Sequence, residues 1–320
     1  MKRSLFAVPL LCLASLGLAE AETIYVATNG SDVDPCGAVD DPCQTIAKAT
    51  NNLMNGGDTV RIMAGTYAEI EQLEPPAGAS WDAPSVVMAN PGDTVVIAPN
   101  APRVFYFGDE RRFIVVDGLV MDGGNATTGV DYTVLTISSA SLGHIRIQNS
   151  ELKNGPSESC ILVGAEHNEF INLNVHDCGS GSGSHGIYIS AKNNLVERSR
   201  FHDNPGSGIH LYSGAGGTDK TSGNVVRHCK TYDNGSSGIV LWHGTGTVAA
   251  DNVSYGNGTK GIAVASAKDV WLTGNYCFGN DVGLLIESDA TDTVALNNII
   301  IDNTVNVDDD STSTLAQRND

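Results

Sequence analysis

Residues that could do chemistry recur on the outward side of a repeated, glycine-initiated strand. The repeat is a glycine followed by a short apolar stretch, and it begins at Gly186, Gly208, Gly238, Gly261 and Gly283. Successive side chains of a strand point to opposite faces. If the isoleucines and leucines face inward, the outward residues of the first three repeats include Tyr188, His210, Tyr212 and Trp242.

Four of the nearby residues fit the needs of β-elimination from a uronate. Tyr188 and His210 occupy one column of consecutive repeats, so we expect them about one strand spacing apart. His210 or His185 could take the proton, because histidine titrates near neutral pH. Tyr188 could protonate the leaving oxygen. Lys192 or a bound Ca²⁺ could neutralise the substrate carboxylate.

Further aromatic residues predict a sugar-binding surface. Tyr212 and Trp242 share a column and could stack on sugar rings, with His243 at the strand edge. A second column precedes a row of asparagine turns and reads Lys153, His176, His202, Tyr232, Tyr255, Phe278 and Ile301. From the two columns we predict Tyr212, Trp242, His243 and His202 as substrate-binding residues.

A row of carboxylates beside the second column supports other interpretations. Asp177, Asp203 and Asp233 stand one repeat apart. Glycoside hydrolysis uses two carboxylates about 5–5.5 Å apart for retention, or roughly 6.5–9.5 Å apart for inversion. The same aspartates also fit turn capping, and the aromatic column also fits a surface ladder without function. Glycan binding without catalysis is a third possibility.

The period of the repeats determines the predicted fold. The glycines are spaced by 22, 30, 23 and 22 residues, and the asparagine row Asn204, Asn234, Asn257, Asn280 and Asn303 by 30, 23, 23 and 23. A period near 23 leaves no room for a helix and holds about three short strands. Stacked coils of this kind form an all-β, right-handed parallel β-helix, or β-solenoid. Inward asparagines would bond to those above and below.

The sequence also predicts how the solenoid begins, ends and is interrupted. A short helix over Gln44–Met54 should cap the first coil, with Thr59–Met63 as the first core strand. Insertions at Gly179–Ser184 and Gly214–Ser222 are both expected between an asparagine turn and an outward strand, where they could wall a cleft. Residues 311–320 are expected to form a loose tail after the acidic run 308–310.

Residues 1–21 have the features of a secretory signal peptide, with cleavage after Ala21. This predicts a secreted protein (extracellular or periplasmic) with one domain over 22–310, including an N-terminal cap at 22–58. Export permits disulfides. Cys36 and Cys43 flank a short loop and are the predicted pair. The other mature cysteines, which fall at apolar positions, are interpreted as packing residues and are Cys160, Cys178, Cys229 and Cys277.

Composition excludes some classes of protein. The 18 basic and 37 acidic residues give a formal net charge of -19. Such a chain does not fit a cationic nucleic-acid-binding protein. The same charge disfavours a polyanionic substrate unless Ca²⁺ bridges the two. The apolar stretch of the signal is too short to span a membrane comfortably, and no other stretch is long and apolar enough. No Cys/His spacing indicates zinc.

Three motifs carry a family resemblance. The segments YVATNGSD at 25–32, DPCQTI at 41–46 and GDTVRIMAGTY at 57–67 resemble the opening of secreted pectin-lyase-like β-helix proteins, including family nine pectate lyases. NPGDTVVI at 90–97 resembles an early coil of those proteins. The resemblance implies the fold, export and activity on carbohydrate. No Asp cluster beside a Lys base matches the calcium-dependent pectate lyases, so no catalytic residue is carried over.

Together these observations predict a secreted, monomeric, carbohydrate-active β-helix protein. The leading hypothesis is a polysaccharide lyase acting on a uronate-containing polymer such as pectate or alginate. The alternatives are a glycoside hydrolase or C5-epimerase on the same scaffold, and a non-catalytic glycan-binding or adhesin-type surface protein. Ca²⁺ is a possible cofactor, no other cofactor is indicated, and neither nucleic acid nor membrane is an expected partner.

Overall fold

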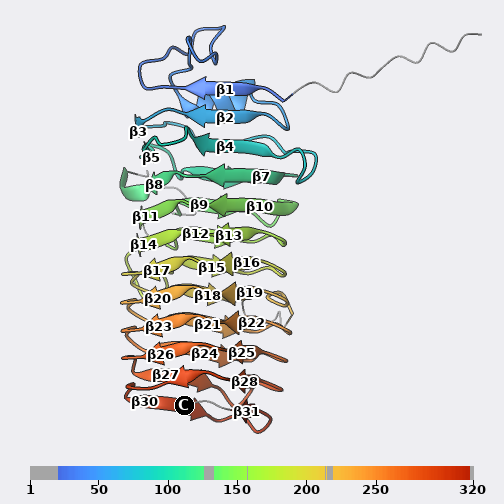
Figure 1. Cartoon of the computed structure of the whole chain (residues 1–320), viewed down its shortest axis with the longest axis vertical. Coiled ribbons are helices and arrows are strands. Elements are labelled where there is room, and N and C mark those ends of the chain that lie inside the picture. Colours follow the sequence, from blue (N-terminus) through green and yellow to red (C-terminus); the bar gives the residue numbers. More distant parts are fainter. Residues whose placement is uncertain (1–20, 126–132, 157, 213, 215–218, 318–320) are drawn as a thin grey trace, which may run out of the picture.

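The computed structural model describes residues 21–125, 133–156, 158–212, 214 and 219–317. Nearly all of the regular structure in these residues is β-strand. The strands form three parallel sheets that run the length of the molecule, and the chain winds from one sheet to the next in stacked coils (Figure 1). The predicted β-solenoid is confirmed. The predicted signal peptide lies outside the described residues, apart from Ala21.

Sheet 1 has twelve strands: β1 (Thr23–Val26), β2 (Thr59–Ile62), β4 (Ser85–Ala89), β7 (Arg112–Asp117), β10 (Gly143–Gln148), β13 (Glu169–Ile171), β16 (Leu195–Glu197), β19 (Val225–Arg227), β22 (Val248–Ala250), β25 (Trp271–Thr273), β28 (Val294–Leu296) and β31 (Leu315–Gln317). Sheet 2 has ten: β3 (Gly65–Tyr67), β5 (Val95–Ile97), β8 (Val120–Asp122), β11 (Glu151–Gly155), β14 (Asn174–Cys178), β17 (Arg200–His202), β20 (Lys230–Tyr232), β23 (Val253–Tyr255), β26 (Tyr276–Phe278) and β29 (Ile299–Ile300).

Sheet 3 carries the glycine-initiated strands and has nine members: β6 (Phe105–Phe107), β9 (Leu135–Ile137), β12 (Ile161–Val163), β15 (Ile187–Ile189), β18 (Ile209–Leu211), β21 (Ile239–Trp242), β24 (Lys260–Ala265), β27 (Val282–Ile286) and β30 (Val305–Asp309). Two short helical segments complete the described structure, η1 (Lys48–Leu53) and η2 (Gly123–Asn125).

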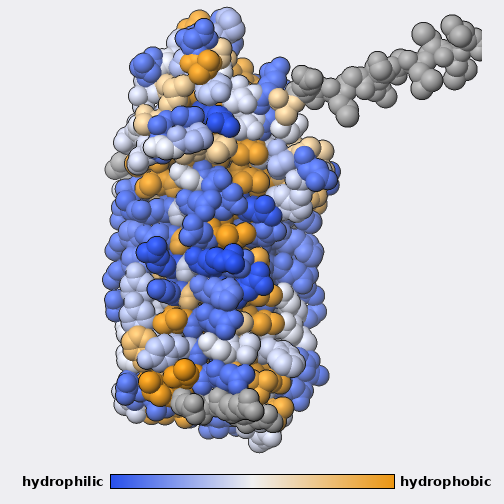
Figure 2. All heavy atoms as spheres, viewed as in Figure 1, coloured by the Kyte–Doolittle hydropathy of each residue, from blue (hydrophilic) through white to orange (hydrophobic). Residues whose placement is uncertain are grey.

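The core is built from columns of apolar side chains, one from each coil. Ile187, Ile209 and Ile239 are paired in register on consecutive strands of sheet 3 and are fully buried. The outward residue between two inward ones is at least partly exposed in most strands. Along the middle coils of the face in Figure 2, hydrophilic side chains predominate. Burial of these columns removes apolar surface from water along the whole axis.

Close stacking explains why each repeat starts with glycine. A Cβ built on Gly186 would lie 2.7 Å from the carbonyl oxygen of Gly208, and one on Gly208 would lie 2.9 Å from that of Gly238. The same clash recurs at Gly261, where the distance to the Gly283 oxygen is 2.5 Å. Only glycine lets consecutive coils approach at this corner.

The predicted asparagine ladder is confirmed. Asn204, Asn234, Asn257 and Asn280 each donate from Nδ2 to Oδ1 of the next asparagine at 2.9–3.0 Å. Their backbone N–H groups donate to the same oxygens. The ladder therefore satisfies turn amides that would otherwise be buried without partners. A second ladder, which the sequence reading missed, runs through Asn252, Asn275 and Asn298.

The N-terminal cap differs from the prediction in two ways. The helix is shorter than Gln44–Met54, and η1 is wound so that the Met54 N–H donates to the Ala49 carbonyl. The first strand of sheet 1 is β1, which pairs with β2, so the strand beginning at Thr59 is the second. The buried carboxylate of Glu69 accepts hydrogen bonds from the N–H groups of Ile46 and Ala47, which begin the helical turn.

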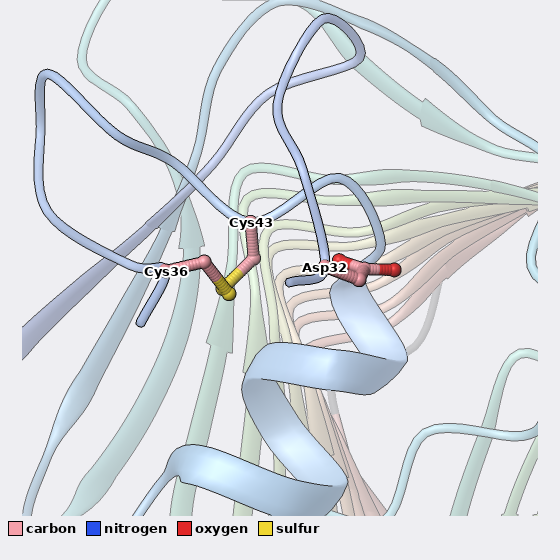
Figure 3. A group of neighbouring side chains, drawn as sticks. All are labelled: Asp32, Cys36 and Cys43. Atoms are coloured by element: carbon pink, nitrogen blue, oxygen red, sulfur yellow. A yellow bond between two sulfur atoms is a disulfide. The ribbon is translucent and has the colours of Figure 1, made fainter. Parts of the chain in front are cut away.

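Asp32 and the Cys36–Cys43 disulfide lie side by side above this turn (Figure 3). The predicted disulfide is therefore confirmed. Asp32 Oδ1 accepts from the N–H groups of Gln44 and Thr45. The sulfurs are bonded to each other, and the Asp32 carboxylate caps the N–H groups that precede the helical turn. The group therefore stabilises the N-terminal cap and is not a metal site.

Cys160 and Cys178 pack in the core, as expected, and they also form a disulfide, a pairing that the sequence leaves open. The corner between sheets 2 and 3 brings the residue before β12 against the last residue of β14. Cys229 and Cys277 are free and buried, as expected. The predicted loose tail instead continues the solenoid as far as Gln317, since β31 pairs with β28. None of the described helices is long and apolar enough to cross a membrane.

Candidate functional site

The outward aromatic residues of sheet 3 form one cluster, as their columns predict. Tyr188 and His210 are register partners on β15 and β18, with ring centroids 5.6 Å apart. Tyr212 follows β18 and lies 4.9 Å from Trp242 on β21. His243 joins them at 5.4 Å from Tyr212. We call these five residues the aromatic patch.

His185 lies beneath the patch rather than at its surface. It is buried, and its Nε2 lies 2.7 Å from Nδ1 of His210. The backbone N–H of Ser207 donates to its Nδ1 at 2.9 Å. Burial lowers the pKa of His185 to about 4, and burial together with the neighbouring His185 lowers the pKa of His210 to about 3. Both imidazoles are therefore neutral at physiological pH.

A groove of about 710 Å³ lies beside the patch and contains two of the predicted catalytic residues. Tyr188 and Lys192 line it from one coil, and Glu166 and His167 line it from the preceding coil. Lys220 lines it from the second insertion. The described lining includes neither histidine of the buried pair, so His210 and His185 adjoin the groove through Tyr188.

The surroundings of Tyr188 and Lys192 in the groove raise the pKa values of both side chains and so keep them protonated. Burial and the nearby Tyr212 raise the pKa of Tyr188 above its ordinary value. Lys192 Nζ donates to Asp219 at 2.8 Å, and this contact raises the pKa of the lysine. His167 Nε2 lies 3.8 Å from the Glu166 carboxylate. Tyr188 therefore holds its proton and Lys192 its positive charge, and Asp219 pairs with that charge.

The groove extends along the solenoid toward the N-terminal coils. A neighbouring hollow of about 270 Å³ shares Ser139, Gly164 and Ser190 with it and ends at Tyr106 on β6. The outward residues between the two tyrosines are Thr136 and Leu162, in register on β9 and β12. The residues that the two hollows share are small. The result is a shallow path along the axis between two tyrosines.

Only one of the two insertions enters where the sequence pattern predicts. Gly179–Ser184 lies between β14 and β15, before the outward strand, and contributes Gly183 and Ser184 to a hollow beside Tyr188. The second insertion instead follows β18 and leads into sheet 1. Its described residues Gly214 and Lys220 line the groove. The loops therefore flank sheet 3 from two sides.

One predicted substrate-binding residue lies elsewhere. His202 belongs to sheet 2, where its ring is stacked between His176 at 4.9 Å and Tyr232 at 4.7 Å. Its Nδ1 lies 2.6 Å from Asp203, and its Nε2 lies 3.0 Å from the Asn174 side chain. The sequence reading placed it near the patch because both columns share one period, but the two columns belong to different sheets.

The carboxylate row is part of the turns. The backbone of Asp177, Asp203 and Asp233 has positive φ, between 52° and 54°. This is the left-handed α conformation, which residues in tight turns adopt. Asp177 and Asp203 contact the histidines that precede them, at 2.6 Å. None of the three lines the groove among the described residues. The turn interpretation of this row is favoured over a hydrolase pair.

Sequence reasoning missed Glu166, His167 and Lys220. The first two occupy the turn after the outward strand, one coil before Lys192, and the His167 N–H donates to the Lys192 carbonyl. Extending the column analysis to this turn would have found Glu166 and His167. Lys220 is placed by an insertion whose path no periodicity predicts.

The structure has three long parallel sheets that are joined into coils, and a groove lies on an outward face. This architecture defines the parallel β-helix class of proteins. A family model described as the right handed beta helix region matches residues 116–252 and 159–320. The chain belongs to this right-handed β-helix family, so the predicted handedness is also confirmed. No match was found among curated protein sequences.

Solved structures share the fold at low identity. The pectate lyase Pel9A is similar over 95% of this chain and 80% of its own, with 17% identity and a TM-score of 0.68. A glycoside hydrolase is similar over 93% and 96%, with 10% identity and a TM-score of 0.64. A mannuronic acid-specific family 6 polysaccharide lyase from the human gut microbiota is similar over 87% and 75%, with 15% identity and a TM-score of 0.59. These likenesses confirm the predicted pectin-lyase-like fold.

Proposed function

We propose that the chain is a secreted, carbohydrate-active protein that cleaves a uronate-containing polysaccharide by β-elimination. The observation that carries the proposal is that Tyr188, Lys192 and His167 line one groove beside exposed aromatic rings. A phenol, an ammonium and an imidazole supply the acid, the cation and the base that this reaction needs. Disulfides are typical of exported proteins, and the described residues contain two.

The residues of the groove divide the reaction as follows. His167 takes the C5 proton, and the electrons of that bond form the C4–C5 double bond. The C4–O4 bond breaks, and the leaving oxygen takes the proton of Tyr188, whose raised pKa keeps it protonated until then. Lys192 and Lys220 offset the charge that grows on the substrate carboxylate.

Calcium fits this groove poorly. Ca²⁺ takes six to eight oxygen ligands, usually with several carboxylates. The described lining offers one carboxylate, Glu166, and two ammonium groups. The lysines therefore take the neutralising role, and activity should persist when divalent metal is removed with EDTA.

The polysaccharide should lie along the solenoid axis. The groove and its extension run from Tyr188 toward Tyr106, while Tyr212 and Trp242 continue the line in the opposite direction. A linear polymer would thus cross several coils. Its sugars would stack on the aromatic patch on one side of the reacting bond and contact Tyr106 on the other.

Glycan binding without catalysis is the second candidate. The Trp242 ring lies beside Tyr212 and 37% of Trp242 is exposed, so it offers an aromatic surface to a sugar. These features alone give affinity and no turnover.

One assay separates the candidates. The mature protein is incubated with pectate, alginate, glycosaminoglycan and neutral glycans, with and without EDTA. Absorbance of an unsaturated uronate product supports the lyase. New reducing ends without that absorbance indicate a hydrolase, and deuterium exchange at C5 without cleavage indicates an epimerase. Affinity without turnover supports the binding protein. The absence of turnover and of binding for every polymer would contradict both candidates.

A further inference from the structure

The hydrogen bond between His185, which lies beneath the aromatic patch, and His210, which belongs to the patch, has a fixed direction. The Ser207 N–H can only donate, so His185 Nδ1 must accept. A neutral imidazole that accepts at one nitrogen carries its proton on the other. His185 Nε2–H therefore donates to His210 Nδ1 at 2.7 Å.

The same reasoning fixes the second ring. Because His210 Nδ1 accepts from His185, the neutral His210 carries its proton on Nε2. Protonation of either ring is disfavoured, since burial and the neighbouring imidazole oppose a positive charge. His210 thus presents an N–H group and no free lone pair, which is the opposite of what a general base requires.

That N–H group has no hydrogen-bond partner within the described residues. His210 Nε2 is buried and unpaired, although nearly every buried polar group in a folded protein is paired. The rings of Tyr188, Tyr212 and Trp242 surround the imidazole at centroid distances of 5.6, 5.8 and 6.4 Å. An unpaired donor at the base of an aromatic patch indicates a ligand that supplies the acceptor.

We infer that His210 binds the sugar by donating a hydrogen bond from Nε2 to a sugar oxygen, and that His185 is a positioning residue that sets the direction of this bond. The inference rests on the proposed function, because it places a saccharide on the patch. Because His210 Nε2 is buried, the side chains around it must shift for a saccharide oxygen to reach it. The acceptor is a hydroxyl, ring or carboxylate oxygen.

The proton positions can be measured without turnover. In ¹⁵N NMR of the histidines at pH 7, both rings should show the tautomer protonated at Nε2, and neither should titrate between pH 5 and 8. Addition of galacturonate or mannuronate tetrasaccharide should shift the His210 Nε2–H resonance downfield. Protonation at Nδ1 in either ring, or an unmoved resonance with saturating tetrasaccharide bound, overturns the inference.

Two substitutions of His210 distinguish a hydrogen-bond donor from a general base. His210→Gln keeps an acceptor for His185 and a donor for the sugar, so KM and kcat should stay within about threefold of the native values. His210→Leu keeps neither, and KM should rise about tenfold with little change in kcat. A general base would lose about 10²–10⁴-fold in kcat in both variants, which would contradict the inference. His202→Gln, on sheet 2, is the matched control and should change neither constant.

The outcomes also distinguish this inference from the proposed function. Cleavage with a large kcat loss in His210→Gln refutes the donor role and leaves the lyase standing. Tetrasaccharide binding with the expected shift, but without cleavage of any polymer, refutes the lyase and supports the donor.

Discussion

Two regions of the solenoid carry aromatic columns, and they differ in the tilt of the rings. On sheet 2, the rings of His176, His202, Tyr232, Tyr255 and Phe278 follow one another at 4.7–5.0 Å with interplanar angles of 3–11°. On sheet 3, the Tyr188–His210 and Tyr212–Trp242 pairs meet at 68° and 60°, whereas His210–Trp242 and Tyr212–His243 lie closer to parallel, at 20° and 26°. We call the first column the ring ladder.

The tilt decides what each column can bind. In the ring ladder each face covers the next, so the interior rings have no free face for a sugar. In the aromatic patch the ring angles vary, the Trp242 side chain is exposed, and an unpaired N–H lies among the rings. Residue type alone does not separate structure from function here, because histidine and tyrosine occur in both columns.

The largest expected difference between the regions is catalytic. Tyr188→Phe removes the proposed acid and should lower kcat by about 10²–10⁴-fold with a small change in KM. Tyr232→Phe makes the same change in the ring ladder and should leave kcat unaltered. Initial rates of unsaturated-product formation measure both. Equal effects in the two variants would remove the functional distinction between the columns.

The pH dependence of stability tests whether His185 and His210 are neutral in the folded protein. Both histidines have lowered pKa values in the folded state, so the unfolded chain binds more protons below pH 6.5. Stability is therefore fully present above pH 6.5 and is lost as the pH falls toward 4, by up to about 1.4 kcal/mol per unit for each histidine.

Urea denaturation at pH 7.5 and 5.0 measures this loss. The double variant His185→Gln/His210→Gln should reduce the difference in unfolding free energy between the two pH values by about 3–4 kcal/mol. His176→Gln, in the ring ladder, serves as the comparison. An undiminished pH dependence in the double variant would show that the pair is not buried in its neutral form.

Removal of one ring should affect saccharide affinity in the aromatic patch and protein stability in the ring ladder. Trp242→Ala removes an open ring face and should weaken tetrasaccharide binding about tenfold, with little loss of stability since the ring is partly exposed. Tyr255→Ala removes a rung of the ring ladder and should lower the unfolding free energy by about 1–3 kcal/mol without changing affinity. Calorimetric titration and thermal melting report the two quantities. The reverse pattern would exchange the roles of the two columns.

The smallest expected effect concerns the far end of the groove. Tyr106→Ala should raise KM about threefold for long polymers and leave KM for a tetrasaccharide unchanged, because only a long chain reaches β6. Rates on substrates of graded length provide the measurement. A length-independent effect would place the substrate across the axis instead of along it.

The fold could be predicted because it is periodic. Glycines recur where coils approach too closely for a Cβ, and asparagines recur where turn amides need partners. Strand alternation then placed Tyr188 beside His210 and Tyr212 beside Trp242, and both pairs are observed. Each of these features depends only on neighbours one coil away.

Other features depend on geometry that the repeat does not contain. The period cannot assign a column to a sheet, which is why His202 was grouped with Trp242. It also cannot show how an insertion folds back, so Lys220 was missed. The direction of the bond between His185 and His210 depends on one backbone N–H, that of Ser207, which belongs to every residue type except proline.

The Cys160–Cys178 disulfide has a mechanical consequence. In a solenoid each coil contacts only its neighbours, so unravelling can start at either end and proceed coil by coil. This disulfide closes a covalent hoop around nearly one coil, directly before the strand that carries Tyr188. When tension or proteolysis unravels the solenoid from its N-terminal end, this disulfide should stop the unravelling from passing Cys178. The coils after the disulfide, which carry Tyr188 and Lys192, would then be protected from unravelling that starts at the N-terminal end, and reduction of this one bond would remove that protection.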